Sequence, residues 1–223
     1  MRYGEEVLRR LSDLEFKEDE YASLVASRSS NPFETLVATV ISQNTNDKNT
    51  MRAMENLKRR LGDLTPEKIV RLSDRELEDL IRPAGLYKQK AKYLKAISER
   101  LSGGALEEIL SLETEEARNK LLEIPGIGPK TADVLLSFMG KETVGVDRHI
   151  ARVSSRLGIS DGSYEGTRRA LMNIFDKKDY LRAHLLLIKL GREYCRPRNP
   201  RCGECPLRDL CDFSHSLKPG DSD

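Results

Sequence analysis

The chain has 223 residues, 38% hydrophobic and 33% charged, which indicates a globular protein with one large or two small domains. Its 38 basic and 36 acidic residues give a net charge of +2, which excludes a uniformly basic nucleic-acid binder and leaves local basic patches as the means of holding such a partner. No apolar run approaches the ~18 residues that span a bilayer, and the N-terminus lacks an apolar signal segment. We therefore expect an intracellular protein with no membrane partner.

Helical periodicity predicts an all-α fold. The pair Asn31-Pro32 supplies an N-cap and a first-turn proline for a helix with an apolar face, which should run into the polar stretch 42–46. Thr65-Pro66 and Ser73-Asp74 predict the starts of two further helices, the second ending near 83–85.

Apolar residues at helical spacing predict another helix over 87–101. Its outer face is expected to carry four lysines: Lys88, Lys90, Lys92 and Lys95. After a Ser-Gly-Gly break at 102–104, one helix should lead into the segment 121–133.

The segment 121–133 reads LLEIPGIGPKTAD, an apolar helix end, a Gly-Ile-Gly hairpin and a second helix. Gly126 and Gly128 can adopt a positive φ or admit another backbone, and Pro129 suits the first helical position. The free amides would then lie at the positive end of a helix dipole, a site for one nucleic-acid phosphate. An ordinary tight turn is the alternative. The apolar residues of 131–139 predict a central buried helix.

Two residues are candidates for chemistry. Lys130 opens the buried helix, where desolvation and positive potential would favour a neutral, nucleophilic amine able to form a Schiff base. The alternative is a lysine that reaches solvent or pairs with a phosphate. Asp147 stands where an N-cap belongs, but its carboxylate could also stabilise positive charge on a ribose or accept a proton. His149 and His184 are interpreted as packing or hydrogen-bonding residues.

The C-terminal part predicts helices over 164–175 and 179–190 and then four cysteines within 17 residues, in the pattern Cys-x6-Cys-x2-Cys-x5-Cys. The ligand set Cys195, Cys202, Cys205 and Cys211 suits tetrahedral zinc or a [4Fe-4S] cluster, and the single Cys-x2-Cys pair favours the cluster without deciding it. The intervening loop carries the cations Arg196, Arg198 and Arg201, which suit phosphate contact; a solvated basic loop is the alternative. The tail from Asp212 should fray.

Together these features resemble the helix-hairpin-helix DNA glycosylases, and within them the endonuclease III branch. The resemblance spans roughly 31–211 and rests on four parts in the same order: Asn31-Pro32-Phe33-Glu34 leading to Gln43, the hairpin with its lysine, Val146-Asp147-x-His149-Ile150, and the cysteine loop. It implies a six-helix barrel domain over 24–141 that holds the hairpin. It also implies a helical iron–sulfur cluster domain formed by 1–23 and 142–223, and a [4Fe-4S] cofactor.

The resemblance implies a base excision repair enzyme that flips a damaged base out of double-stranded DNA. Lys130 would attack C1′, Asp147 would stabilise the developing charge, and β-elimination would nick the strand 3′ to the abasic site. Gln43 and Leu86 resemble residues that fill the vacated stack, and Gly126 and Gly128 the phosphate-binding hairpin. Oxidised pyrimidines are the expected lesions, and a nucleoid-associated, cytoplasmic monomer is the expected state.

Two alternatives stay open. One is a thymine or uracil glycosylase specific for mismatches, within the same fold. Asn44, Asn46 and Arg148 depart from the family pattern where they could touch the base pocket or opposite strand, so they leave the substrate range open but not the reaction type. The other is a non-catalytic DNA-binding or redox-sensing protein in which Lys130 binds phosphate. The adenine-mismatch glycosylases generally lack a lysine at this position, so Lys130 favours a bifunctional enzyme.

Overall fold

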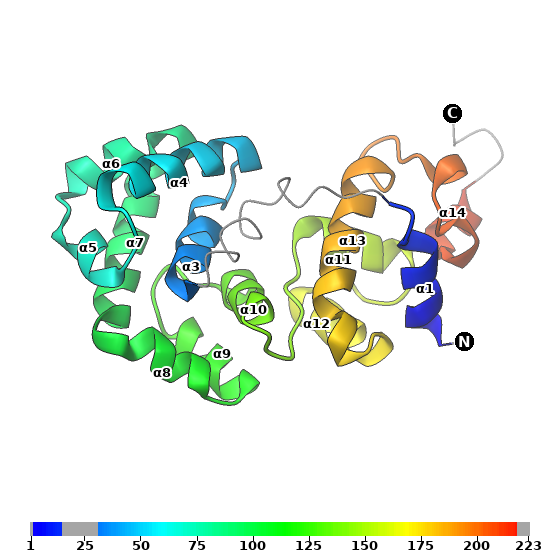
Figure 1. The fold of residues 1–223 in the computed structure, drawn as a ribbon. Helices are drawn as coiled ribbons and strands as arrows, with labels where there is room; N and C mark the ends of the chain where they lie inside the picture. Colours follow the sequence, from blue (N-terminus) through cyan, green and yellow to red (C-terminus); the bar gives the residue numbers. More distant parts are fainter. Residues whose placement is uncertain (1, 15–30, 218–223) are drawn as a thin grey trace. The chain divides into compact units, whose positions relative to one another are not determined.

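The computed structural model describes residues 2–14 and 31–217, and within them the secondary structure is helical with no strand (Figure 1). This confirms the all-α prediction. The described residues divide into two compact units, one formed by 31–141 and the other by 2–14 with 142–217. The boundary expected at residues 23 and 24 lies outside the described residues. None of the described helices combines the length and apolar character needed to cross a bilayer.

The unit formed by 31–141 has a single hydrophobic core to which all of its α-helices contribute. The helices α5 and α6 pack against α7, while α10 packs against both α3 and α9. In chain order they are α3 (Pro32–Ile41), α4 (Asp47–Leu61), α5 (Pro66–Arg71), α6 (Asp74–Ile81), α7 (Tyr87–Leu101), α8 (Ala105–Ser111), α9 (Thr114–Leu122) and α10 (Pro129–Phe138).

The helix starts in this unit follow from local capping. Asn31 Oδ1 accepts hydrogen bonds from the amides of Phe33 (3.0 Å) and Glu34 (3.3 Å), as its sequence position predicts. Thr65 and Ser73 cap α5 and α6 in the same way, through their hydroxyl oxygens. These three helix starts are confirmed, because each depends on a polar side chain within three residues of the amides it satisfies.

The helix α10 is the buried centre of this unit, as expected from its apolar composition. Every residue from Thr131 to Ser137 is buried, and Figure 1 shows α10 beside α3 and α9. A helix whose side chains are all buried needs no polar face. Its N-terminal end is the exception, and the hairpin meets it there.

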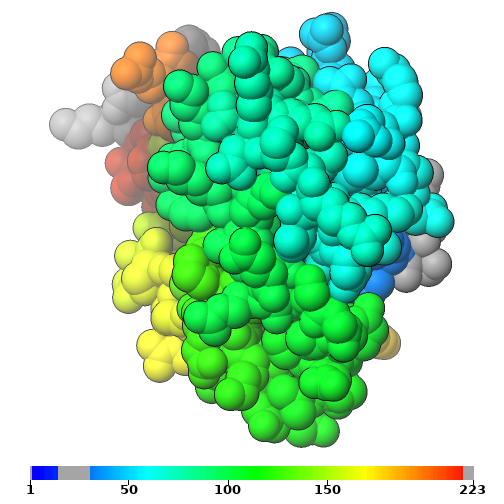
Figure 2. All heavy atoms as spheres, turned by 90° about the vertical axis from the view of Figure 1, so that its left-hand side faces the viewer, coloured from blue at the N-terminus to red at the C-terminus, as the bar shows by residue number. Residues whose placement is uncertain are grey.

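In this unit the sequence interpretation missed α4 and merged two other helices. Asn46 caps α4 by accepting from the Asn49 amide at 2.8 Å, a signal that was present in the sequence. The single helix expected before the hairpin is wrong: α8 and α9 are separate, because Leu112 is extended and packs its side chain against the core. The face formed by α4 to α9 fills Figure 2, with the early part in cyan and the later part in green.

The prediction that Lys90 lies on the outer face of α7 is wrong. Lys88 and Lys92 are exposed, but Lys90 is only 2% exposed and its amine lies inside the unit. Ammonium groups are rarely buried without partners, and Lys90 has two carbonyl acceptors there.

The second unit is built around α13 (Tyr180–Glu193), which packs against α1 (Tyr3–Leu11) and α11 (Arg148–Arg156). The helix α12 (Tyr164–Ile174) packs against α11, so both predicted helices of this region are confirmed, with ends shifted by up to three residues. The expectation that the tail frays from Asp212 is wrong for its described part, because α14 (Asp212–Ser216) packs against α11; residues 218–223 lie outside the described residues.

Candidate active site and cysteine cavity

The hairpin between α9 and α10 is anchored by Ile124 and Ile127, both buried in the core. The Ile127 amide donates to the Ile124 carbonyl at 3.0 Å, which closes the turn. Gly126 between them has φ +95°, and a β-carbon there would lie 2.7 Å from Cβ of Tyr93. Glycine is therefore required at 126 by backbone conformation and by the close approach of α7.

Gly128 has a different role from Gly126. It is the N-cap of α10 with φ −92°, it offers no side chain to the first-turn amides, and Pro129 occupies the first helical position as expected. A β-carbon at Gly128 would meet no atom of the described residues within 4 Å. The helix start is thus open to an anion, with the positive end of the dipole behind it.

Lys130 is exposed at the second position of α10. The expectation that it is buried behind the hairpin is wrong, because burial in α10 begins one residue later, at Thr131. Its amine can therefore reach a ligand bound at the helix start. The reason to consider it a nucleophile is now its placement beside the open Gly128, rather than desolvation.

Gln43 and Leu86 belong to the same unit as the hairpin. Gln43 Nε2 lies 3.3 Å from Thr131 Oγ1 and 3.5 Å from the Gly126 carbonyl oxygen, so the structure brings Gln43 to the hairpin. Leu86 is 57% exposed, which is unusual for a large apolar side chain, and its backbone is left-handed (φ 47°, ψ 28°). A strained, exposed leucine is costly to an isolated protein and suits a residue that inserts into a partner.

Asp147 belongs to the other unit. Its Oδ1 accepts the Ile150 amide at 2.8 Å and caps α11, so the N-cap expectation is confirmed, and the side chain is half-buried. His149 packs beside Gly191, and burial lowers the pKa of its imidazole against the opposing effect of Asp147. Because Oδ1 of Asp147 is held by the cap, the direction of its other carboxylate oxygen, Oδ2, is fixed as well.

Two residues hold the segment before Asp147; sequence reasoning gave His184 only a general packing or hydrogen-bonding role, which is confirmed, and missed Arg168. His184 Nδ1 donates to the Gly145 carbonyl (2.8 Å), which places the imidazole proton on Nδ1. Arg168 Nε donates to Thr143 Oγ1 (2.9 Å), and both residues are buried. These bonds orient the approach to α11 from helices far along the chain, so no local signal could have revealed them.

The four cysteines line one cavity, together with Arg156, Arg208, Tyr194 and Phe213. Burial raises the pKa of the Cys205 thiol to about 11, so thiolates here need compensating positive charge, which bound metal supplies. Arg156 Nη1 lies 3.4 Å from Cys195 Sγ. Sulfurs distributed around a cavity, with a cation and aromatic rings as its walls, fit an iron–sulfur cluster.

The cysteine loop is held by two arginines of α11 that sequence reasoning also missed. Arg152 Nε donates to the Cys195 carbonyl (2.8 Å), and Arg156 donates to the carbonyls of Arg196 (2.7 Å) and Pro197 (3.2 Å). The helix capped by Asp147 therefore also anchors the first cysteine. Both arginines saturate backbone acceptors that a loop would otherwise leave to water.

The three loop arginines are all exposed, as phosphate contact requires. Arg201 differs from Arg196 and Arg198 because it pairs with Glu204 and its guanidinium lies 5.6 Å from the Tyr194 ring centroid. Part of its charge is already neutralised within the loop.

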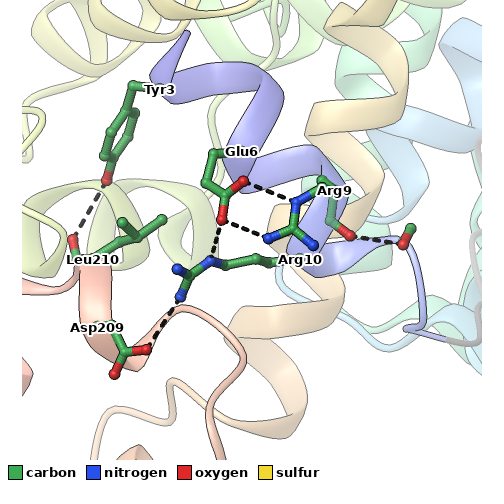
Figure 3. Close-up of polar contacts among 7 residues, drawn as sticks. Tyr3, Glu6, Arg9, Arg10, Asp209 and Leu210 are labelled. Carbon is green, nitrogen blue, oxygen red and sulfur yellow. Dashed lines mark hydrogen bonds and ion pairs between the residues drawn. The ribbon is translucent and has the colours of Figure 1, made fainter. Parts of the chain in front are cut away.

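The N-terminal helix α1 contacts the C-terminal end of the cysteine loop at Asp209 and Leu210 (Figure 3). Arg10 Nη1 lies 3.5 Å from an oxygen of Asp209, and Tyr3 Oη donates to the carbonyl of Leu210 at 3.5 Å. Glu6 holds Arg9 and Arg10 through bonds of 2.7 to 2.9 Å and has a pKa lowered to about 2 by those hydrogen bonds. The segments 2–14 and 208–211 thus form one local structure although they lie at opposite ends of the chain.

Comparison with known proteins agrees with this geometry. The family described as HhH-GPD superfamily base excision DNA repair protein matches residues 37–177, and the iron–sulfur binding domain of endonuclease III matches 195–211. Endonuclease III of Sulfolobus acidocaldarius is 36% identical over 86% of this chain and 86% of its own. The chain belongs to the endonuclease III family.

Endonuclease III of Bacillus subtilis is similarly 36% identical, over 82% of this chain and 81% of its own length. Among solved structures, a non-covalent endonuclease III–DNA complex superposes with a TM-score of 0.77 at 29% identity, covering 96% of this chain and 98% of the other. A trapped endonuclease III–DNA covalent intermediate gives 0.74 at 28%, with the same coverage. The predicted two-domain glycosylase fold is confirmed.

Membership of the endonuclease III family makes this protein a base excision repair DNA glycosylase and AP lyase that carries a [4Fe-4S] cluster and acts on DNA. A thermostable thymine-DNA glycosylase, at 19% identity and a TM-score of 0.68 over 96% of each chain, shares the fold alone.

Proposed function

We propose that this endonuclease III family member excises oxidised pyrimidines from double-stranded DNA and nicks the strand 3′ to the resulting abasic site. The observation that carries the proposal is the placement of Lys130, exposed in the first turn of α10 beside the open face of Gly128. A phosphate held by the first-turn amides would place a neighbouring sugar near the amine.

We also propose the expected domains, 24–141 for the barrel and 1–23 with 142–223 for the cluster domain.

In the proposed reaction the lesion is flipped out of the duplex, and Lys130 Nζ donates its lone pair to C1′. The C1′–N glycosidic bond breaks, and its electron pair leaves with the base. Asp147 stabilises the positive charge on the sugar and accepts the proton lost by the amine. The nitrogen lone pair then breaks the C1′–O4′ bond, O4′ takes a proton from water, and the ring opens to a protonated Schiff base. Water accepts a C2′ proton, the electron pair of that C–H bond forms the C2′–C3′ double bond and the C3′–O bond breaks, so that the 3′ phosphate leaves. Hydrolysis of the Schiff base then releases Lys130.

The other residues hold the DNA and the cluster. Gln43 and Leu86 would fill the space left by the flipped base, and Arg196 and Arg198 would contact phosphates, with a smaller part for Arg201 because of Glu204. The proposed cluster ligands are the four cavity cysteines, Cys195, Cys202, Cys205 and Cys211. The cluster has no part in the lyase chemistry.

Borohydride trapping on a duplex with one abasic site tests the nucleophile. Wild-type protein should form a covalent adduct, and Lys130→Ala should not. Lys120→Ala is the matched control, because Lys120 is an exposed lysine on the preceding helix, and it should still be trapped. An adduct that persists in Lys130→Ala would remove Lys130 from the mechanism. No adduct from bound wild-type protein would favour a monofunctional glycosylase that uses water, or a non-catalytic binder.

Asp147→Asn separates chemistry from capping, since asparagine also caps helices well. Base release from a thymine-glycol duplex should fall on the order of 10²-fold or more while the melting temperature is unchanged. Full release by the variant would show that the carboxylate charge is not needed.

Release from thymine-glycol and G·T duplexes, measured side by side, tests the lesion class. Preference for G·T would support the mismatch-specific glycosylase in place of our proposal. We expect the protein to act as a monomer at the nucleoid, and light scattering with and without DNA measures its state.

A further inference from the structure

Lys90 is the most deeply buried lysine among the described residues, and its amine joins two separate segments. Its Nζ donates to the carbonyl oxygens of Ile41 and Ala84, each at 2.8 Å. Burial lowers the pKa of this amine to about 8. A neutral amine still has two N–H groups, so both bonds survive deprotonation.

The two carbonyls hold equivalent places relative to the proposed stack-filling residues. Ile41 is the last residue of α3, and Gln43 follows it by two positions. Ala84 ends the 3₁₀ turn η2 (Arg82–Ala84), and Leu86 follows it by two positions. One amine therefore links the segments that carry Gln43 and Leu86.

The same helix reaches the hairpin. Tyr93, one turn after Lys90 in α7, packs against Gly126, and Gln43 lies within hydrogen-bond distance of Thr131 at the start of α10. The backbone amide of Lys90 also donates to the carbonyl of Leu86 at 3.0 Å. Leu86, Gln43 and the hairpin are thus connected through α7 within one unit.

A purely structural role would be carbonyl capping, and Lys68 shows what that looks like. Lys68 Nζ donates to the carbonyls of Leu61 and Asp63 at 2.9 Å, but it is only half-buried and joins two parts of one turn. Lys90 bears the greater cost of a buried amine to connect segments 43 residues apart. That cost, and the left-handed backbone of exposed Leu86, indicate that Lys90 fixes the relative positions of these two segments in addition to stabilising the fold.

We propose that Lys90 is a positioning residue that sets the separation of Gln43 and Leu86, so that both enter the duplex together when a base is flipped. The inference rests on the proposed function, because it takes Gln43 and Leu86 as the residues that fill the stack. Lys90 itself touches neither DNA nor the reacting atoms.

The test compares Lys90→Met with Lys68→Met, since each removes one amine that bonds two carbonyls. The readouts are single-turnover base release from a thymine-glycol duplex and the fluorescence of 2-aminopurine placed opposite the lesion, which reports local unstacking. Lys90→Met should slow release about tenfold or more and reduce the fluorescence change on binding. Lys68→Met should leave both unchanged at a temperature where each variant is folded.

A double-mutant cycle shows whether Lys90 acts through Gln43 and Leu86. In a Gln43→Ala, Leu86→Ala background, Lys90→Met should have little further effect on release. Equal slowing by Lys90→Met in both backgrounds, or wild-type fluorescence and release in Lys90→Met, would overturn the inference.

Lys90→Gln, which keeps an uncharged NH₂ donor, should recover part of the release rate, and it carries the test if Lys90→Met does not fold. If Lys90→Gln releases the base no faster than a folded Lys90→Met, the inference is contradicted. It is also contradicted if Lys90→Gln slows release equally in the wild-type and the Gln43→Ala, Leu86→Ala backgrounds. Failure of the proposed function is distinguishable, because wild-type protein itself would then give no release from the thymine-glycol duplex.

Discussion

The ion pair between Arg118 and Asp133 should be the main polar clamp across the helix-hairpin-helix. Arg118 lies on α9 and Asp133 on α10, and Arg118 Nε is 3.0 Å from each carboxylate oxygen. The Asp133 side chain is 0% exposed and that of Arg118 is 8% exposed. Replacing Arg118 with methionine keeps the aliphatic bulk but leaves a buried carboxylate without its guanidinium.

Breaking a buried ion pair from one side costs about 3–5 kcal/mol, because the remaining charge keeps its desolvation penalty. For a chain of this size, that loss corresponds to a fall of roughly 6–20 °C in melting temperature. Lys120→Met on the same helix is the matched control. The Lys120 and Glu123 side chains are 52% and 67% exposed and 3.8 Å apart, so a loss below about 1 kcal/mol is expected.

Urea unfolding followed by circular dichroism measures both variants. The double variant Arg118→Met, Asp133→Leu should recover most of the lost stability, because it removes both charges and fills the space. A loss for Arg118→Met no larger than for Lys120→Met would refute the clamp.

Three further outcomes are expected. Burial lowers the pKa of Lys90 from its ordinary 10.5 to about 8, so between these pH values the unfolded chain binds more protons than the folded one. The free energy of unfolding of wild type, relative to that of Lys90→Met, should therefore rise as pH increases from about 8 to 10.5. A difference between the two proteins that does not change with pH would contradict the burial of this amine. Gly126→Ala should lower the free energy of unfolding in urea by about 2–4 kcal/mol, because of the φ of +95° and the Tyr93 contact. Gly128→Ala should lower it by less than ~1 kcal/mol and yet weaken DNA binding. Equal losses of stability would contradict the different roles of the two glycines. Cys205→Ser should lower iron and acid-labile sulfide in the purified protein, and an undiminished cluster would remove Cys205 from the ligand set.

Features set by neighbours in the chain could be predicted from the sequence. Asn31, Thr65 and Asp147 cap the helices that follow them, because a cap needs only a polar oxygen within reach of amides two or three residues ahead. The hairpin was equally readable, since Ile124 and Ile127 are spaced to anchor it and Gly126 supplies the positive φ. The cysteine spacing indicated a four-thiolate metal site and favoured a cluster over zinc without deciding it; the family resemblance implied the [4Fe-4S] cluster, and the family match supports it.

The depth of a long side chain could not be read in this way. Lys130 was expected inside and is exposed, while Lys90 was expected outside and is buried. The difference lies in what other helices place nearby: Lys90 lies between two carbonyls from α3 and η2, whereas the described residues leave Lys130 exposed in the first turn of α10.

The sequence by itself therefore determined the helices with clear caps, the hairpin and the residue types available for chemistry. Only the tertiary structure decided that Arg152 and Arg156 hold the cysteine loop, that His184 orients the approach to Asp147, and that Lys90 links the segments of Gln43 and Leu86. These contacts join residues far apart in the chain. A buried lysine, arginine or histidine is stable only where folding brings it acceptors, and the identity of those acceptors is a property of packing rather than of local sequence.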